Sequence, residues 1–220
     1  MDLVINEMLP TVQDSGLAEF CDIFCEKGVF TAEQSRKVLE AAKEMGFKLK
    51  IHADEIENLG GSALAAILGA TSADHLLVTS DEDINKLALR GVVAVLLPGT
   101  TFNLREGHYA PARKMIAEGV PVALATDFNP GSCPTNNLQL IMTIACLYLE
   151  MTPAEVINAV TINAAHAIDR GSKIGSIEVG KQADIVIFDA PNYKYLPYRF
   201  GTNLVDTVIK KGRIVIGGDV

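Results

Sequence analysis

Short apolar runs alternate with amphipathic segments from residue 18 to about residue 150. The apolar runs have the length of single strands, and the segments between them, of about 10 to 16 residues, have the period of surface helices. Such alternation is typical of successive β/α units around a parallel sheet. The pattern predicts five strands: Glu19 to Phe24, Phe47 to His52, Ser72 to Val78, Val92 to Leu97, and Val120 to Asp127.

Residues typical of helix ends support this division. Thr31 and Gln34 have the spacing of a capping box, in which each side chain bonds the other residue's backbone N–H, and Gly46 follows at the expected helix end. A second helix is predicted from Ser80 to Arg90, with Gly91 ending it.

A later helix is predicted to begin at Thr152, with Pro153 in its first turn and Glu155 completing another capping box, and to continue toward Ala167. Beyond Gly171 the pattern changes to β-rich runs bounded by glycine. These runs are Gly175 to Val179, Ala183 to Phe188, and Val205 to Val215. We therefore expect two parts, a partial barrel over residues 1–170 and a small C-terminal β segment over residues 171–220.

Five β/α units are too few to close a barrel. A complete TIM-type (β/α) barrel has eight strands and about 250 residues. We therefore expect an α/β fold that forms a partial TIM-type barrel. Its unpaired strand edges and uncovered apolar interior predict association, either as a homodimer or with the remaining barrel strands.

The composition narrows the classes of protein. With 49% hydrophobic and 21% charged residues, the chain is expected to be globular, and it has neither a signal-peptide pattern nor an apolar run of membrane-spanning length. A cytoplasmic location without a membrane partner follows as the expectation. The net charge of −8 is spread along the chain and disfavours nucleic acid as a partner. The cysteines match no zinc or redox spacing and are predicted to be reduced thiols; they are Cys21, Cys25, Cys133 and Cys146.

The string KLKIHADE, residues 48–55, puts polar side chains at the end of a predicted strand. Period-two alternation puts Leu49 and Ile51 on one face and His52 on the other, which faces away from the helices. Barrel enzymes carry their catalytic groups at this end of their strands, and Glu55 follows on the loop. A histidine beside acids is also a common structural feature, so both interpretations stay open at this point.

Two further candidates follow strand ends. His75 lies near the end of the next strand, where the alternative is a hydrogen-bonded structural histidine. Asp127 ends a strand rich in small residues, and its alternative role is to cap a turn. The loop beyond it contains Asn129, Gly131 and Ser132, whose side chains and free backbone N–H groups are suited to grip a ligand.

Taken together, the three residues His52, His75 and Asp127 indicate a shared site more strongly than any one of them does. The carboxyl ends of parallel strands open at one mouth, so these three side chains are expected to converge there. Imidazole and carboxylate form a donor set that suits zinc or iron. The other histidines lack this placement, and we predict His108 in a loop and His166 on or against a helix surface.

Several strings resemble the imidazolonepropionase family of the amidohydrolase superfamily. They are KIHADE, the histidine 20 residues beyond Glu55, ATDFNPGS, TINAAHAI and IGSIEVGKQADIVIFDA. HADE and TDFNPGS in this order are specific to that family, whereas GKQADIVIFD is shared by many amidohydrolases. The resemblance covers essentially the whole chain. It implies hydrolysis of a small cyclic amide, 4-imidazolone-5-propanoate, to N-formimidoyl-L-glutamate in histidine degradation.

The resemblance also implies roles for individual residues. One divalent metal ion, zinc or iron, would be bound by His52 and Asp127. Glu55 would contact the substrate ring and the metal-bound water, while His75 would assist proton transfer. Glu55, His75 and Asp127 are thus the candidate catalytic residues. Substrate would further be bound at Asn129, Gly131 and Ser132.

The chain departs from the family pattern in one respect. The superfamily places an HxH pair of metal ligands on its first barrel strand, and this sequence has none. We therefore expect weak metal binding and little activity from this chain alone, as an incomplete fragment. Two alternatives remain, namely another amidohydrolase such as a nucleobase-type deaminase, or a non-catalytic scaffold.

Overall fold

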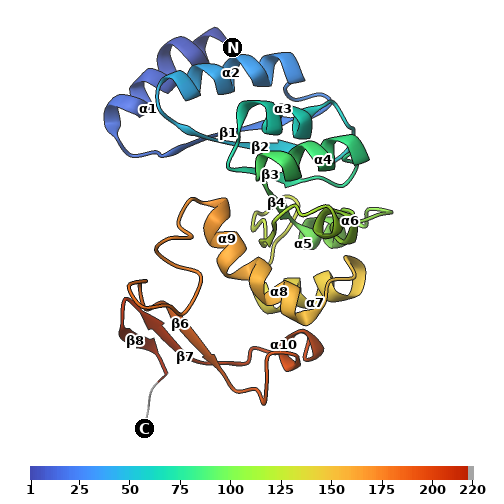
Figure 1. Ribbon diagram of the computed structural model, residues 1–220, viewed down its shortest axis with the longest axis vertical. Coiled ribbons are helices and arrows are strands. Elements are labelled where there is room, and N and C mark those ends of the chain that lie inside the picture. The colour runs from blue at the N-terminus through green and yellow to red at the C-terminus, as the bar shows by residue number, and fades with distance from the viewer. Residues whose placement is uncertain (218–220) are drawn as a thin grey trace. The chain divides into compact units, whose positions relative to one another are not determined.

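The computed structural model describes residues 1–217 and confirms the α/β class (Figure 1). All five predicted strands are present, and the order in their sheet is β1-β2-β3-β4-β5. Their bounds are Phe20–Cys25 (β1), Lys48–Ala53 (β2), Ser72–His75 (β3), Val93–Leu96 (β4) and Val122–Leu124 (β5). The parallel register pairs Phe24 with His52 and Ala53 with His75, which brings the ends of the first three strands to one edge.

The described residues form two compact units. The first unit comprises Met1–Leu96 and Lys114–Pro121, and the second comprises Leu97–Arg113 and the residues from Val122 onward. The boundary predicted near residue 170 stays a prediction.

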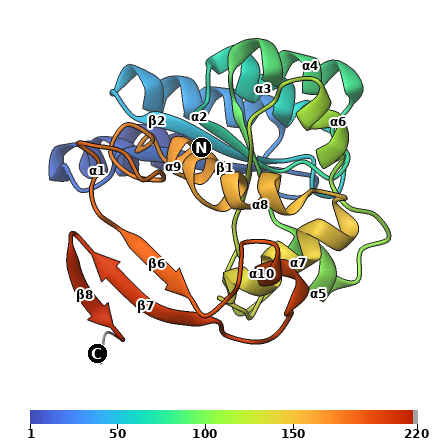
Figure 2. The same cartoon turned by 60° about the horizontal axis from the view of Figure 1, so that its bottom comes forward.

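In the first unit, helices cover one face of the strands. Helices α2 (Ala32–Glu44), α3 (Gly61–Leu68) and α4 (Asp81–Arg90) lie on the same side of β1 to β3, as Figures 1 and 2 show. The predicted capping box at Thr31 is formed in full, and Gly91 ends α4 in a left-handed conformation. A π-helix η1 (Val4–Met8) and helix α1 (Leu9–Ser15) precede the strands.

Side chains along β2 alternate between a buried face and a more accessible face of the sheet. Leu49, Ile51 and Ala53 are buried beneath the helices, whereas His52 on the opposite face stays partly accessible, as predicted. Helix α3 begins directly against this strand, because a Cβ on Gly61 would lie 2.6 Å from the Cβ of Ala53. Close packing on one face therefore turns His52 toward the other.

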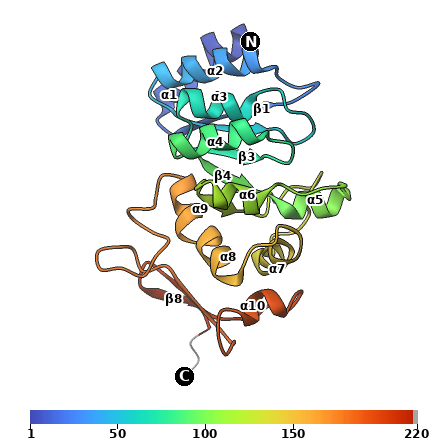
Figure 3. The same ribbon diagram turned by 45° about the vertical axis from the view of Figure 1, so that its right-hand side comes forward.

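The second unit is mostly helical, with a separate small sheet (Figure 3). Its helices include α5 (Pro98–Leu104), α7 (Leu138–Tyr148), α8 (Pro153–Val160), α9 (Ile162–Ala167) and α10 (Tyr195–Tyr198), and α6 (Ala112–Ala117) crosses from this unit into the first. The antiparallel sheet has the order β6-β7-β8, with bounds Ile185–Phe188, Val205–Lys210 and Arg213–Ile216. The change to β structure predicted beyond Gly171 is therefore confirmed.

Three boundary predictions were wrong. Strand β3 ends at His75 because His75 and Leu76 have φ values of 76° and 61°, and β5 ends at Leu124 rather than at Asp127. The predicted helix from Thr152 toward Ala167 is two helices. It breaks at Thr161, whose φ of −122° and ψ of −95° are not helical, and the Thr161 hydroxyl donates to the Ile157 carbonyl.

No strand forms over residues 175–179 within the described chain. Gly175 and Gly180 have φ values of 94° and 92°, which end extended structure at both limits of the segment. Its apolar residues Ile177 and Val179 are exposed. The predicted run from Val205 to Val215 is a hairpin that turns at Lys211 and Gly212.

Other predictions concern single residues. All four cysteines are free thiols. His108 lies in a loop, and the ring of His166 on α9 packs against Gly171, where a Cβ would lie 2.3 Å from its Cε1. Among residues 1–217, no helix is long and apolar enough to cross a membrane.

Candidate active site

Two of the predicted site residues lie side by side on adjacent strands of the first unit. His52 is near the end of β2 and His75 is the last residue of β3, and their ring centroids are 5.3 Å apart. The His75 side chain is 5% exposed and that of His52 is 30% exposed. An accessible imidazole thus stands beside a buried one at a strand edge.

Glu55 joins this pair from the loop after β2. Its Oε1 lies 3.3 Å from Nδ1 of His75. The Glu55 side chain is itself largely buried. A carboxylate in contact with an imidazole is an arrangement suited to moving protons. The structure therefore groups three predicted residues, His52, Glu55 and His75, within one unit.

Asp22 on β1 is a neighbour of His52 that was not predicted. Its Oδ2 lies 3.0 Å from Nδ1 of His52. A carboxylate at Nδ1 holds the proton on that nitrogen and leaves Nε2 unprotonated, which is the form of the ring that binds metals or takes up protons. The available signal was the string FCDIFC, in which alternation places Asp22 and Phe24 on the same strand face.

Asp54, between His52 and Glu55, points to the helix side instead. Its Oδ2 accepts hydrogen bonds from the hydroxyls of Ser62 and Thr79, while Oδ1 is buried with no hydrogen-bond partner among the residues described. Burial raises the pKa of this carboxyl, because a charge is poorly solvated there.

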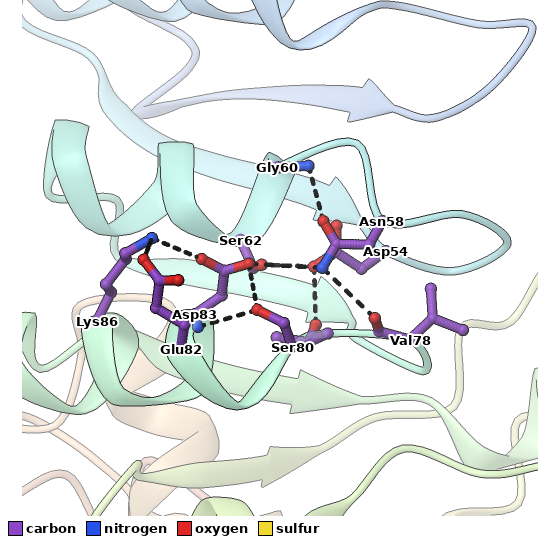
Figure 4. A network of polar contacts seen from close by, with 10 residues as sticks. Asp54, Asn58, Gly60, Ser62, Val78, Ser80, Glu82, Asp83 and Lys86 are labelled. Atoms are coloured by element: carbon purple, nitrogen blue, oxygen red, sulfur yellow. Dashed lines mark hydrogen bonds and ion pairs between the residues drawn. The ribbon is translucent and has the colours of Figure 1, made fainter.

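A wider polar network surrounds Asp54 (Figure 4). The amide of Asn58 donates to Asp83, and Asp83 also accepts from the hydroxyl of Ser80, the N-cap of α4. Lys86 pairs with Asp83 at 2.9 Å. These contacts tie the loop after β2 to the start of α4, so this network is structural.

In the second unit, Asp127 is held at the start of its loop. Thr100 Oγ1 donates to Asp127 Oδ2 at 2.6 Å, and the backbone of Asp127 has a φ of 52°, a value that few residues other than glycine adopt. Thr100 belongs to α5, whose packing against the loop is close: a Cβ on Gly99 would lie 2.9 Å from Cys133 Sγ.

Asn129 organises the rest of this loop. Its Oδ1 accepts from the backbone N–H groups of Gly131 and Ser132 at 2.9 and 2.7 Å. Its Nδ2 donates to the Asp127 carbonyl and to the Ser132 hydroxyl, each at 2.8 Å. The prediction of free N–H groups in this loop was therefore wrong, because a local Asx turn uses them.

The residues predicted as one site are thus seen as two groups. His52, Glu55 and His75 belong to the first unit, and Asp127 with its loop belongs to the second. Their convergence at one mouth stays a prediction. Within residues 1–217, no group of three or more His, Cys, Asp or Glu residues is placed to hold a metal ion. Since a catalytic zinc needs three protein ligands, the donors present do not by themselves fit such an ion.

The sequence model of the amidohydrolase family matches residues 25–215, and the chain belongs to that family. Within the family it is similar to imidazolonepropionases. It is 64% identical to the imidazolonepropionase of Alkaliphilus metalliredigens (strain QYMF) over 216 residues, which is 98% of this chain and 51% of that protein. Identity to the imidazolonepropionase of Streptococcus gordonii is 58% over the same shares. The chain therefore spans about half the length of the curated relatives it matches.

A solved structure has a similar fold. The crystal structure of an adenosine deaminase from Xanthomonas campestris with bound zinc superposes with a TM-score of 0.78 at 22% identity. The superposition covers 96% of this chain and 55% of the deaminase chain. At this identity the likeness shows the fold alone.

Proposed function

We propose that this chain is part of a hydrolase that opens the ring of 4-imidazolone-5-propanoate with water to give N-formimidoyl-L-glutamate. The high identity to imidazolonepropionases supports this substrate. The contact between Glu55 and His75 is the observation that carries the chemistry. Because the curated relatives are about twice as long, we infer that the active protein has their length, and we call it the full-length protein.

In this proposal, Glu55 and His75 handle the protons of the reaction. Hydrolysis adds the oxygen of water to the ring carbonyl carbon and breaks its bond to the ring nitrogen, which needs a proton to leave. The Glu55 carboxylate accepts a proton from the attacking water, and the Glu55–His75 pair returns one to the departing nitrogen. Burial of the pair keeps bulk water from competing for these protons.

The loop after β5 is proposed to bind substrate or product. The residues proposed to bind are Asn129, Gly131 and Ser132, and binding would exchange one set of hydrogen bonds for another. The N–H groups of Gly131 and Ser132 now donate to the Asn129 side chain. Release of those two donors would offer them to an anionic ligand.

The proposal includes one divalent ion, zinc or iron, with His52 and Asp127 as two of its ligands. The other ligands would come from parts of the full-length protein that this chain does not span. We also propose that the full-length protein acts in the cytoplasm in histidine breakdown. The unpaired strand edges of this chain would associate, either as a homodimer or with the remaining barrel strands.

The test is turnover of 4-imidazolone-5-propanoate by the full-length protein, followed as formation of N-formimidoyl-L-glutamate. Glu55→Gln should lower kcat by about 10² to 10⁴, because the amide cannot accept the proton. Glu33→Gln, an exposed carboxylate on α2, is the matched control and should leave kcat unchanged. Ammonia release from a nucleobase, with no ring opening of the imidazolone, would instead identify a deaminase.

A further inference from the structure

Glu26 is a buried carboxylate that follows β1 directly and is only 1% exposed. We propose that Glu26 is the positioning residue for Glu55: it anchors the backbone of the loop from which Glu55 reaches His75. This inference rests on the proposed function of Glu55, although the anchoring itself can be measured separately.

Four backbone N–H groups converge on the Glu26 carboxylate. Oε2 accepts from the N–H groups of Glu55 and Ile56 at 3.1 and 2.9 Å. Oε1 accepts from those of Glu57 and Lys27 at 3.1 and 2.7 Å. Both oxygens are therefore fully used, and three consecutive residues of the loop are bound by one side chain.

The loop backbone is shaped to receive this anion. Asp54 has a φ of 53°, and the left-handed turn at this residue leads into the three consecutive N–H groups that point at one carboxylate. Successive N–H groups in such a turn form a concave anion-binding nest. Hydrogen bonds to a charged acceptor are about twice as strong as neutral ones, which offsets the cost of burying the Glu26 charge.

The anchor bears directly on the site. The N–H of Glu55 is fixed to Glu26, and its side chain reaches Nδ1 of His75 at 3.3 Å. His75 in turn is fixed by its place on β3. A shift of about 1 Å in a reacting group can cost about a hundredfold in rate, so holding the Glu55 backbone still affects the reaction.

The loop has other ties that do not involve Glu26. The carbonyl of Ala53 accepts from the N–H of Leu76 at 3.1 Å, and that of Asp54 accepts from the N–H of Val78 at 2.9 Å. These bonds join the loop to the end of β3. Removal of the Glu26 anchor should therefore loosen residues 55–57 without unfolding the unit.

The test is Glu26→Gln in the full-length protein. Glutamine has the same shape but offers one acceptor oxygen, so in either orientation an NH₂ group faces two N–H donors. We expect hydrogen exchange of the amides of residues 55–57 to become at least about tenfold faster, and kcat/KM to fall about tenfold to a hundredfold. In a Glu55→Gln background, Glu26→Gln should cost less than about twofold more, because its effect acts through Glu55.

Two further variants separate positioning from general stability. Glu26→Asp keeps the charge on a shorter arm and should give an intermediate loss, and it serves as the test protein if Glu26→Gln does not fold. Val38→Ala removes buried volume on α2, outside the loop but in the same unit, and it should leave kcat/KM and the exchange of residues 55–57 unchanged.

Normal exchange and normal kcat/KM in Glu26→Gln would overturn the proposal. So would fully additive losses in the double variant, because they would show that Glu26 acts independently of Glu55. A wild-type protein that does not hydrolyse the imidazolone would defeat the proposed function, while the exchange measurement would still decide whether Glu26 anchors the loop.

Discussion

Asp22 and His52 form a carboxylate–imidazole pair that orients the His52 ring. The distance of 3.0 Å between Asp22 Oδ2 and His52 Nδ1 favours the tautomer with its proton on Nδ1. If His52 is a metal ligand, as proposed, this contact sets the ring angle and raises the basicity of Nε2. Groups of this kind commonly contribute tenfold to a hundredfold to metal affinity.

Asp22→Ala in the full-length protein should therefore weaken zinc binding by about tenfold to a hundredfold. A competitive chelator titration measures the affinity, and the ¹⁵N shifts of the His52 ring report which nitrogen carries the proton. Asp14→Ala, on the exposed part of α1, is the control and should change neither. Unchanged affinity together with an unchanged His52 tautomer would contradict the orienting role.

The face of β2 that His52 occupies was predictable from the sequence. Alternation along β2 was enough to predict the face that His52 occupies, because the period of a strand is fixed by its geometry. The contacts of Asp22 and Glu26 could not be predicted in this way. They depend on the register between β1 and β2 and on the path of the loop after β2, which are three-dimensional properties.

At the scale of elements, the start of α8 combines a capping box with an ion pair. The Thr152 and Glu155 side chains cap the helix reciprocally, and Arg113 binds both oxygens of Glu155 at 2.6 and 2.8 Å. The hydrogen bond from Arg113 is the main cause that lowers the pKa of Glu155 to about 2. Local spacing predicted the cap, but Arg113 is 42 residues away in sequence and was not predicted.

Glu155→Gln should lower the free energy of unfolding at pH 7 by about 1 kcal/mol, a figure reduced for solvent screening of a partly exposed pair. The folded-state pKa lies below the ordinary value of 4.5, so this stability is present above pH 4.5 and is lost as the pH falls toward 2. The difference from wild type in urea unfolding should therefore shrink between pH 7 and pH 3. Glu106→Gln, which removes an exposed carboxylate from the loop after α5, is the control variant, and a constant difference for Glu155→Gln would refute the explanation.

Element boundaries were less predictable than the elements themselves. The apolar period continues through Thr161, so the sequence favours one helix, whereas the backbone at Thr161 leaves the helical region. The segment of residues 175–179 has strand-like composition, yet glycines with positive φ bound it. Strand formation requires a pairing partner as well as suitable residues, and sequence periodicity does not identify that partner.

For the whole molecule, the main question is which residues would complete the coordination of the proposed metal ion. Two of the proposed ligands, His52 and Asp127, lie in different units. The family and the parallel β/α order were predictable because their motifs are local strings and regular repeats. Whether the proposed ligands meet could not be predicted in this way, because it depends on the three-dimensional paths of strands that are distant in sequence.

Metal retention tests this directly. A polypeptide of these 220 residues, dialysed after exposure to equimolar zinc, should keep well below one ion per chain, because two ligands bind far more weakly than the three of a catalytic site. The full-length protein should keep about one ion, measured by plasma mass spectrometry. His52→Ala should remove that ion, whereas His166→Ala, on α9 against Gly171, should retain it. Stoichiometric retention by the 220-residue polypeptide would show instead that this sequence supplies every ligand, and the proposed contribution from outside it would be wrong.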